Sequence, residues 1–178
     1  MKPINIWTAR CGPDTRGMLV LQPCGELARM TRRQRIVALQ SAMEEGIQRG
    51  ELIDVMSEVR IEHQHIDGVY IRTMHLPAGR AIVGKIHKHN HCAILQRGRV
   101  TVFTEWGREE LEGPQTFTSP AGVKRGILAH TDTVWTTIHA TDETDLDRIE
   151  EQMIAKSYAD FDAFAEENEA MLTNRVLQ

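Results

Sequence analysis

The sequence predicts a mainly β protein: an antiparallel barrel with a helical extension before it and a helix after it. From residue 59 onward, strand-forming residues alternate with polar ones, which is the period of a half-buried strand. Glycine and proline divide this region into short runs at regular spacing, as in antiparallel sandwiches and barrels. On both sides the apolar residues recur at helical spacing. We therefore divide the chain into an N-terminal extension with a helix (1–58), a barrel (59–140) and a C-terminal acidic helix (141–178).

Composition narrows the classes of function. The 178 residues can form one domain with an appendage, and no apolar run is long enough to span a membrane. The first residues lack the pattern of a secretion signal. Acidic residues crowd the C-terminal tail, which argues against nucleic-acid binding there. The three cysteines are odd in number and lack CxxC spacing, so we expect reduced thiols, with a zinc site at Cys11 and Cys24 as the alternative.

The N-terminal extension carries clear helix signals. Thr31 and Gln34 match a capping box, in which each side chain bonds to the other's backbone amide. Apolar residues then follow at helical spacing until Gly50, which suits a helix end. The apolar residues over 52–59 predict a second, shorter helix, and residues 18–21 predict a short strand.

The barrel region reads as a series of strands. Asp67-Gly68 is a hairpin turn signal, and further glycine and proline turns separate the later runs. The predicted strands span residues 59–65, 69–76, 80–87, 91–96, 99–105, 109–112, 116–119, 123–130 and 133–140.

After residue 140 the period is again helical. The segment Thr144-Asp145-Leu146-Asp147 is a helix start signal, because its two aspartates suit the positive end of a helix dipole. We expect a break in this helix near Asp160. The apolar stripe of this helix is wider than one small barrel needs, so we expect it to pack on the barrel or on a partner and to support a homo-oligomer. The stripe consists of Leu146, Ile149, Met153, Phe161 and Phe164.

Three histidines stand at alternate positions before a short apolar run: His87, His89 and His91. Alternate residues of a strand share one face. Histidine is also the commonest metal-ligating side chain. The stretch therefore predicts a metal or ligand site inside the barrel.

Glycines and prolines around these histidines form a recognisable skeleton: Pro77-Ala78-Gly79, Gly98, Gly113 and Pro120-Ala121-Gly122. In this skeleton the segment 77–139 resembles the cupin family, whose two motifs place a His-x-His, a glutamate and a last histidine around one metal. The resemblance implies a small double-stranded β-barrel, here a jelly roll. The whole layout, including the acidic segment after residue 140, is also similar to cupin-like proteins of tailed bacteriophages.

The ligand positions depart from the cupin pattern. Counted back from Gly98, His91 stands where cupins have glutamate, His87 at the second histidine and Lys85 at the first. Arg125 stands at the last histidine. Only His87 keeps its family identity, although His91 is a ligand-type replacement.

Geometry gives two ways to pair these histidines. In one straight strand, His87 and His91 would lie roughly 13 Å apart at Cα, too far for one ion. A turn at 88–90, which Asn90 suits, would make them face each other and leave His89 at the loop tip. We favour this hairpin. The alternative pairs His87 with His89 on one strand.

Other residues complete the predicted site. His139 shares a face with Trp135 and Thr137 on the last strand, which makes it our third ligand. Arg125 cannot bind a metal, but its planar fork suits a carboxylate or phosphate. Lys85, Arg72 and Tyr70 are further candidates for anion or substrate binding, and the weaker metal candidates are His65, His75 and His130.

Two functions follow from this site. The first is a non-catalytic metal-binding module that serves binding or assembly, with a virion or host-cytoplasm location and with other virion proteins as partners. The second is a metal-dependent small-molecule enzyme of dioxygenase or isomerase type, with open positions on the ion. The ion would be zinc, iron, manganese or nickel, and a small anion would bind beside it.

Overall fold

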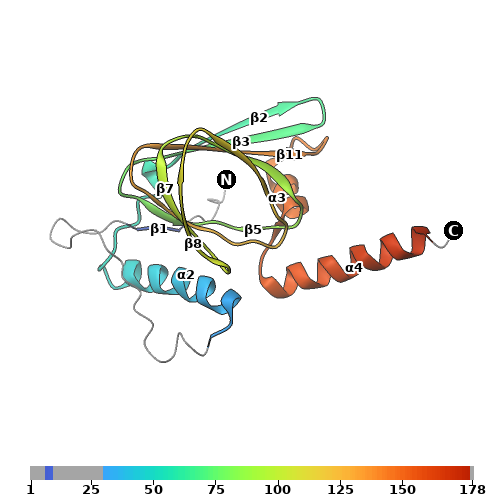
Figure 1. Cartoon of the computed structure of the whole chain (residues 1–178), viewed down its shortest axis with the longest axis horizontal. Coiled ribbons are helices and arrows are strands. Elements are labelled where there is room, and N and C mark those ends of the chain that lie inside the picture. The colour runs from blue at the N-terminus through green and yellow to red at the C-terminus, as the bar shows by residue number, and fades with distance from the viewer. Residues whose placement is uncertain (1–6, 10–29, 177–178) are drawn as a thin grey trace.

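The chain forms two five-stranded antiparallel sheets that face each other and close a barrel (Figure 1). This computed structural model describes residues 7–9 and 30–176, and the side chains of 30–169. The predicted fold class is confirmed: the chain is mainly β and antiparallel, with helices before and after the barrel. The strand expected at 18–21 lies outside the described residues, as do Cys11 and Cys24.

The strand order is that of a jelly roll. The first sheet runs β1 (Trp7–Ala9), β4 (Ala81–Val83), β10 (Gly126–Ala129), β7 (Arg99–Thr104) and β8 (Gly107–Glu112). The second runs β2 (Arg60–Ile66), β3 (Val69–Leu76), β11 (Thr133–Ala140), β6 (His91–Arg97) and β9 (Gln115–Ser119). Strand β10 lies between β4 and β7, and β11 lies between β3 and β6, so each inserts between two strands that precede it in the sequence. A separate pair joins β5 (Ile86–His87) to β12 (Ile154–Ala155).

Strand register divides the barrel interior into an apolar half and a polar half. Trp135 on β11 pairs with Met74 on β3 and with Leu95 on β6, so one inward row is apolar. Two residues along each strand, the next row contains Arg72 and Thr137. The third inward row contains Tyr70 and His139, which pair with each other across the two strands. The polar half therefore lies at one end of the barrel. The buried apolar core consists of Val59, Met74, Leu76, Ile82, Ala93, Leu95, Val100, Val102, Ile127, Ala129 and Trp135.

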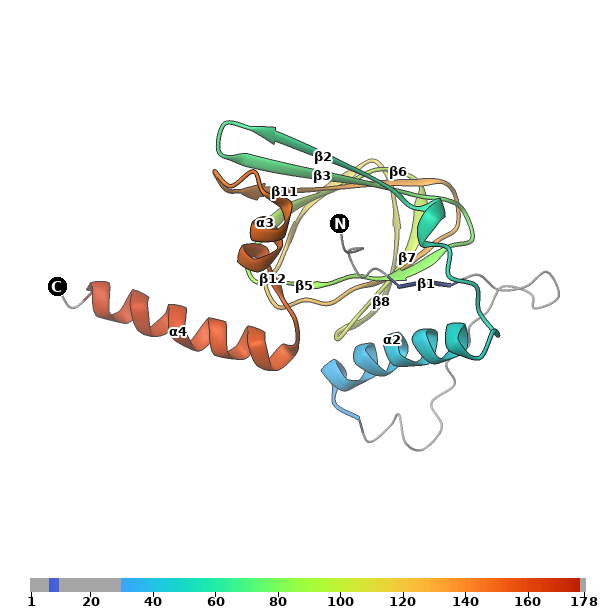
Figure 2. The same cartoon turned by 180° about the vertical axis from the view of Figure 1, so that it is seen from behind.

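Helix α2 (Arg32–Gln48) lies beside β1 on the outside of the first sheet (Figures 1 and 2). Its predicted capping box is present, because Thr31 Oγ1 accepts from the Gln34 amide while the Gln34 side chain accepts from the Thr31 amide. Met43 on α2 packs against Val83 on β4. Helix α2 ends at Gln48, and Gly50 follows with a φ of 71°, a conformation that glycine adopts without strain.

Two predicted elements need correction. The second helix expected over 52–59 is only a short 3₁₀ turn, η1 (Met56–Glu58). Leu52 packs on the α2 side while Val59 packs in the barrel core, so the segment bridges two packing sites instead of presenting one helical face. The strand expected over 80–87 divides into β4 and β5, because β4 pairs with β10 whereas β5 pairs with β12.

The C-terminal helix is also two helices. Asp145 caps α3 (Leu146–Met153), and α4 (Tyr158–Val176) follows. The interruption falls at 154–157, before the expected break near Asp160, because β12 leaves helical geometry to pair with β5. Figures 1 and 2 show α3 against the barrel and α4 extending away from it.

The proposed domain boundaries stay a prediction, although β2 begins at Arg60 and β11 ends at Ala140. One strand of the first sheet, β1, comes from the N-terminal extension. Among the described residues, no helix combines the length and apolar character needed to cross a membrane.

Gly98, in the turn between β6 and β7, provides a stability test. Its φ is +104°, and an added Cβ would lie 2.5 Å from Thr133 Oγ1 and 2.8 Å from Thr133 Cα. We predict that Gly98→Ala lowers the free energy of unfolding by about 3 kcal/mol, from overpacking and backbone strain together. Gly79→Ala is the matched control: φ is +75° but nothing lies within 4 Å, so the loss should be about 1 kcal/mol. Equal losses in urea unfolding would contradict this explanation.

Candidate metal centre

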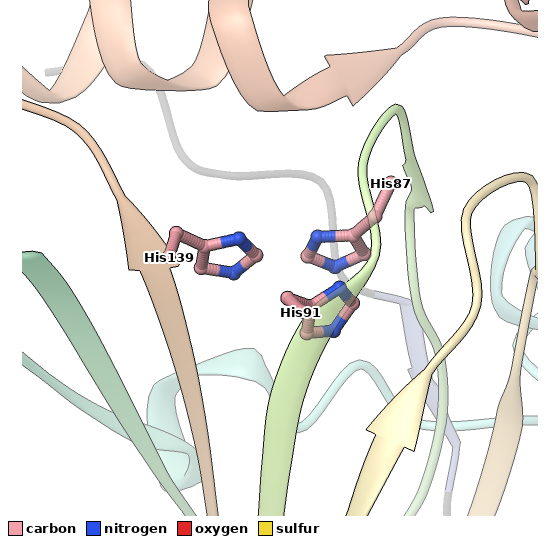
Figure 3. Close-up of side chains that lie close together, drawn as sticks. All are labelled: His87, His91 and His139. Carbon is pink, nitrogen blue, oxygen red and sulfur yellow. The ribbon is translucent and has the colours of Figure 1, made fainter.

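Three histidine rings converge at the polar end of the barrel (Figure 3). His87 ends β5, His91 begins β6 and His139 lies on β11. The ring centroids are 4.2 Å apart for His87 and His91, 4.6 Å for His91 and His139, and 5.1 Å for His87 and His139. Residues from three different strands therefore meet at one point.

The turn at residues 88–90 places two of these rings. Asn90 Oδ1 accepts from the Ala121 amide at 2.8 Å, and the His87 carbonyl accepts from the Gly122 amide at 2.9 Å. Both bonds tie the turn to the Pro120-Ala121-Gly122 segment. The strands on either side of the turn do not pair with each other, since β5 pairs with β12 while β6 pairs with β9 and β11. The chain nevertheless reverses, and His87 faces His91.

His89 takes no part in this cluster. Its side chain is exposed and meets the edge of Phe164 on α4, with ring centroids 5.1 Å apart. The structure thus brings together His87, His91 and His139, and leaves the straight-strand pair of His87 and His89 apart.

The geometry of the rings fits one metal ion. The ligand nitrogens all lie within 4.8 Å of one another. Nitrogens bound to one ion at about 2.0–2.1 Å can be no more than about 4.2 Å apart, so a small ring rotation completes the site. His91 Nδ1 donates to the His89 carbonyl at 3.2 Å, which leaves the Nε2 lone pair free, as in many metal-binding histidines. Among the described residues, buried His87 Nδ1 has no hydrogen-bond partner, as expected of a ligand atom.

Burial and nearby positive charges favour the neutral form of the three imidazoles. Burial is the main cause in each case: it lowers the pKa of His91, lowers that of His139 to about 4 and holds that of His87 well below 6.5. The other two rings and the guanidinium groups of Arg72 and Arg125 lower the pKa of His87 further. Neutral imidazole is the form that binds metal.

The histidines open onto a cavity of about 130 Å³ inside the barrel. Helix α3 forms its roof, where Ile149 and Met153 pack against Tyr70. Ile127 and Trp135 contribute apolar wall from the two sheets. The cavity is therefore apolar on much of its surface, with the histidines and a few other polar groups at one end.

The four residues predicted to bind an anion all line this cavity. Arg125 Nη1 donates to Ser119 Oγ at 2.7 Å. Lys85 forms an ion pair with Glu150 on α3. Tyr70 shares a hydrogen bond of 2.7 Å between its hydroxyl and His63 Nδ1. Arg72 lies beside Thr137 on the paired strands β3 and β11.

The weaker metal candidates lie elsewhere. His75 bonds to Arg60 and Glu62 outside the cavity, and His130 Nε2 bonds to Thr101 Oγ1 at 2.7 Å. The His65 ring lies 5.3 Å from that of Tyr70, tilted by 33°, but its side chain is exposed.

Sequence reasoning missed four polar residues of the cavity. Thr137 was recognisable, because it shares a face with His139. His63, Ser119 and Glu150 depend on long-range pairing: β9 sets Ser119 opposite His91, and α3 carries Glu150 over the cavity. No local signal in the sequence reports such pairings.

Comparison with known proteins finds solved structures with a similar fold but no related sequence. No family model matches the chain, and no curated sequence is similar to it. KdgF from Halomonas sp. is similar in structure, with 15% identity and a TM-score of 0.44 over 54% of this chain and 89% of that one. A cupin superfamily protein from Desulfitobacterium hafniense has 14% identity and a TM-score of 0.41 over 47% and 78%. A cupin-2 domain protein from Shewanella frigidimarina has 10% and 0.39 over 46% and 79%.

The lowered pKa values of the histidines predict a pH dependence for the metal-free protein. An unfolded imidazole has a pKa of about 6.5, whereas that of folded His139 is about 4. Between these values the unfolded chain binds protons that the folded chain does not. The free energy of unfolding should therefore fall as pH drops from about 6.5 towards 4, with at most about 3 kcal/mol from His139.

This dependence can be measured by urea unfolding with a chelator present. His139→Gln should flatten the fall between pH 7 and 5, whatever it does to stability at pH 7. A wild-type protein equally stable at both pH values would contradict the burial of neutral imidazoles.

Proposed function

We propose that this chain is a metal-binding cupin-like module in which His87, His91 and His139 hold one divalent ion. The observation that carries the proposal is the convergence of three imidazoles from β5, β6 and β11, of which His91 and His139 are buried and His87 is partly buried. The bond from His91 Nδ1 to the His89 carbonyl and the unpartnered His87 Nδ1 support it. The cupin resemblance adds the spacing of His87 and His91 from Gly98.

The three imidazole nitrogens narrow the choice of metal ion. Three imidazoles suit zinc, iron or nickel, with manganese as a harder alternative. Zinc bound by three histidines keeps a further position for water or another ligand. On this proposal that position faces the cavity.

We favour a non-catalytic role in binding or assembly. Two positions of the cupin ligand pattern carry Lys85 and Arg125, and Lys85 is engaged by Glu150. The resemblance to cupin-like proteins of tailed bacteriophages supports a phage protein, acting in the virion or in the host cytoplasm, with other virion proteins as partners.

One observation favours the alternative, a metal-dependent enzyme of dioxygenase or isomerase type. Three protein ligands and an adjoining cavity leave room for a substrate on the ion. Cobalt substitution tests this alternative: an enzyme needs an exchangeable position on the ion, so azide must change the visible spectrum of the cobalt protein if the chain is one. An unchanged spectrum would leave only the non-catalytic role.

Metal content tests the proposal directly. His87→Ala and His91→Ala should each abolish binding of one zinc per chain, because each removes one of only three ligands. His89→Ala is the matched control from the same turn and should keep the metal. The measurement is metal analysis after dialysis against zinc, iron, manganese or nickel at neutral pH.

Two outcomes would contradict the assignment. Loss of metal in His89→Ala with retention in His91→Ala would show that the straight-strand pair binds the ion. A wild-type protein that takes up none of the four metals would refute the metal site altogether.

A homo-oligomer is part of the assembly proposal. Much of the predicted apolar stripe contacts the chain's own barrel, since Ile149 and Met153 pack on Tyr70, and Phe164 meets His89. The remaining candidate for subunit contact is the part of α4 that extends beyond the barrel (Figure 2).

We predict that deleting residues 165–178 lowers the number of subunits, measured by light scattering as the mass of the particle divided by that of one truncated chain, because it removes this part of α4 and leaves α3, Phe161 and Phe164 in place. Metal content serves as the folding control and should not change. An unchanged number of subunits would exclude this part of the helix as the subunit contact.

A further inference from the structure

We infer that the cavity binds a small carboxylate anion, held by Arg72 and Arg125 next to the histidines. The inference deepens the proposed function, on which it rests for the metal beside the anion, but the arginine contacts stand on their own observations. Its starting point is the charge balance of the cavity.

The cavity carries more positive than negative charge. Its charged lining residues are Arg72, Lys85, Arg125 and Glu150. Lys85 and Glu150 compensate each other as an ion pair. Glu105 acts on Arg125 and Glu150 on Arg72 from a distance, but no carboxylate among the described residues lies within ion-pair distance of either arginine. Two guanidinium charges therefore remain, and a divalent ion would add two more.

Such an excess of buried charge is costly unless an anion compensates it. Both side chains are partly buried, and this burial lowers the pKa of each guanidinium group even though Tyr70 and Glu150 act against it at Arg72 and Glu105 at Arg125. A carboxylate in this space would remove the excess. It would also give each arginine the planar partner that its fork fits best.

Polar groups around the arginines are arranged to receive such a ligand. Ser119 Oγ holds one arm of Arg125 at 2.7 Å, which fixes that guanidinium at the cavity wall. Arg72 stands between His63 on β2 and Thr137 on β11. Among the described residues, Thr137 Oγ1 is buried with no hydrogen-bond partner. An anion bound between the two arginines would therefore also have the Thr137 hydroxyl, which lines the same cavity, as a hydrogen-bond donor.

Size and wall chemistry select the class of anion. The cavity of about 130 Å³ is slightly smaller than the cavity of about 150 Å³ that holds one benzene molecule. A ligand of about six non-hydrogen atoms fits, whereas a nucleotide or a sugar phosphate does not. Ile149 and Met153 of the roof are apolar, as is Trp135 of the wall. Such walls favour a short carbon skeleton over inorganic phosphate, and so point to a small carboxylate.

Calorimetry with malonate tests this inference. Malonate should bind the wild-type protein both with and without zinc. Arg72→Gln and Arg125→Gln should each weaken binding about 30-fold or more, because each leaves one carboxylate contact unmade. Arg108→Gln is the matched control: Arg108 is exposed and pairs with Glu110 on β8, so its loss should change nothing.

Further measurements keep the outcomes distinct. Arg72→Lys and Arg125→Lys keep the charge and should bind malonate with intermediate affinity, which covers the case in which a glutamine variant fails to fold. All four variants should retain zinc. Phosphate should bind more weakly than malonate.

Each proposal fails in a different way. If zinc binds but malonate does not, or if the arginine variants bind malonate as the wild type does, the carboxylate site is overturned and the metal site stands. If phosphate binds as tightly as malonate, the assignment to a carboxylate is overturned. If zinc never binds but malonate binding depends on both arginines, the metal proposal falls and the carboxylate site stands.

Discussion

The candidate site depends on the short pairing between β5 and β12. His87 pairs with Ile154 and Ile86 with Ala155, while the Lys88 amide donates to the Met153 carbonyl at 2.8 Å. These few backbone bonds hold His87 opposite His91 and also fix the end of α3 over the cavity. One ligand strand and the roof are therefore a single connected unit, so movement of the roof would also move a histidine.

The second sheet separates stability from chemistry. Its register places Trp135, Met74 and Leu95 in one inward row, where burial of apolar surface stabilises the barrel. Two rows along, the same strands present Tyr70 and His139, where burial instead keeps imidazole neutral at a cost in stability at low pH. A cavity with two arginines joins these two halves, and neither arginine forms an ion pair with a carboxylate of the described residues.

Local signals in the sequence were sufficient to predict most of the helices and strands. The period of two, the Asp67-Gly68 turn and the capping box at Thr31 each act within a few residues, and each appears in the structure. The cupin resemblance, through the spacing from Gly98, also singled out His87 and His91, and the turn signal at Asn90 that brings them together is again local. By contrast, β12, the roof and the inward facing of Arg72 depend on pairings between distant residues. A single sequence carries no period or turn signal for such pairings, so Glu150 could not be assigned to the cavity.

X-ray absorption spectroscopy of the zinc-loaded protein tests the three-histidine centre most directly. The structure predicts a first shell of nitrogen or oxygen at about 2.0–2.1 Å, with outer-shell scattering from three imidazoles. Cys92 follows His91 in the sequence but points to the opposite face of β6. A sulfur scatterer at about 2.3 Å, or outer-shell scattering from a single imidazole, would contradict the assignment of His87, His91 and His139 as the ligands.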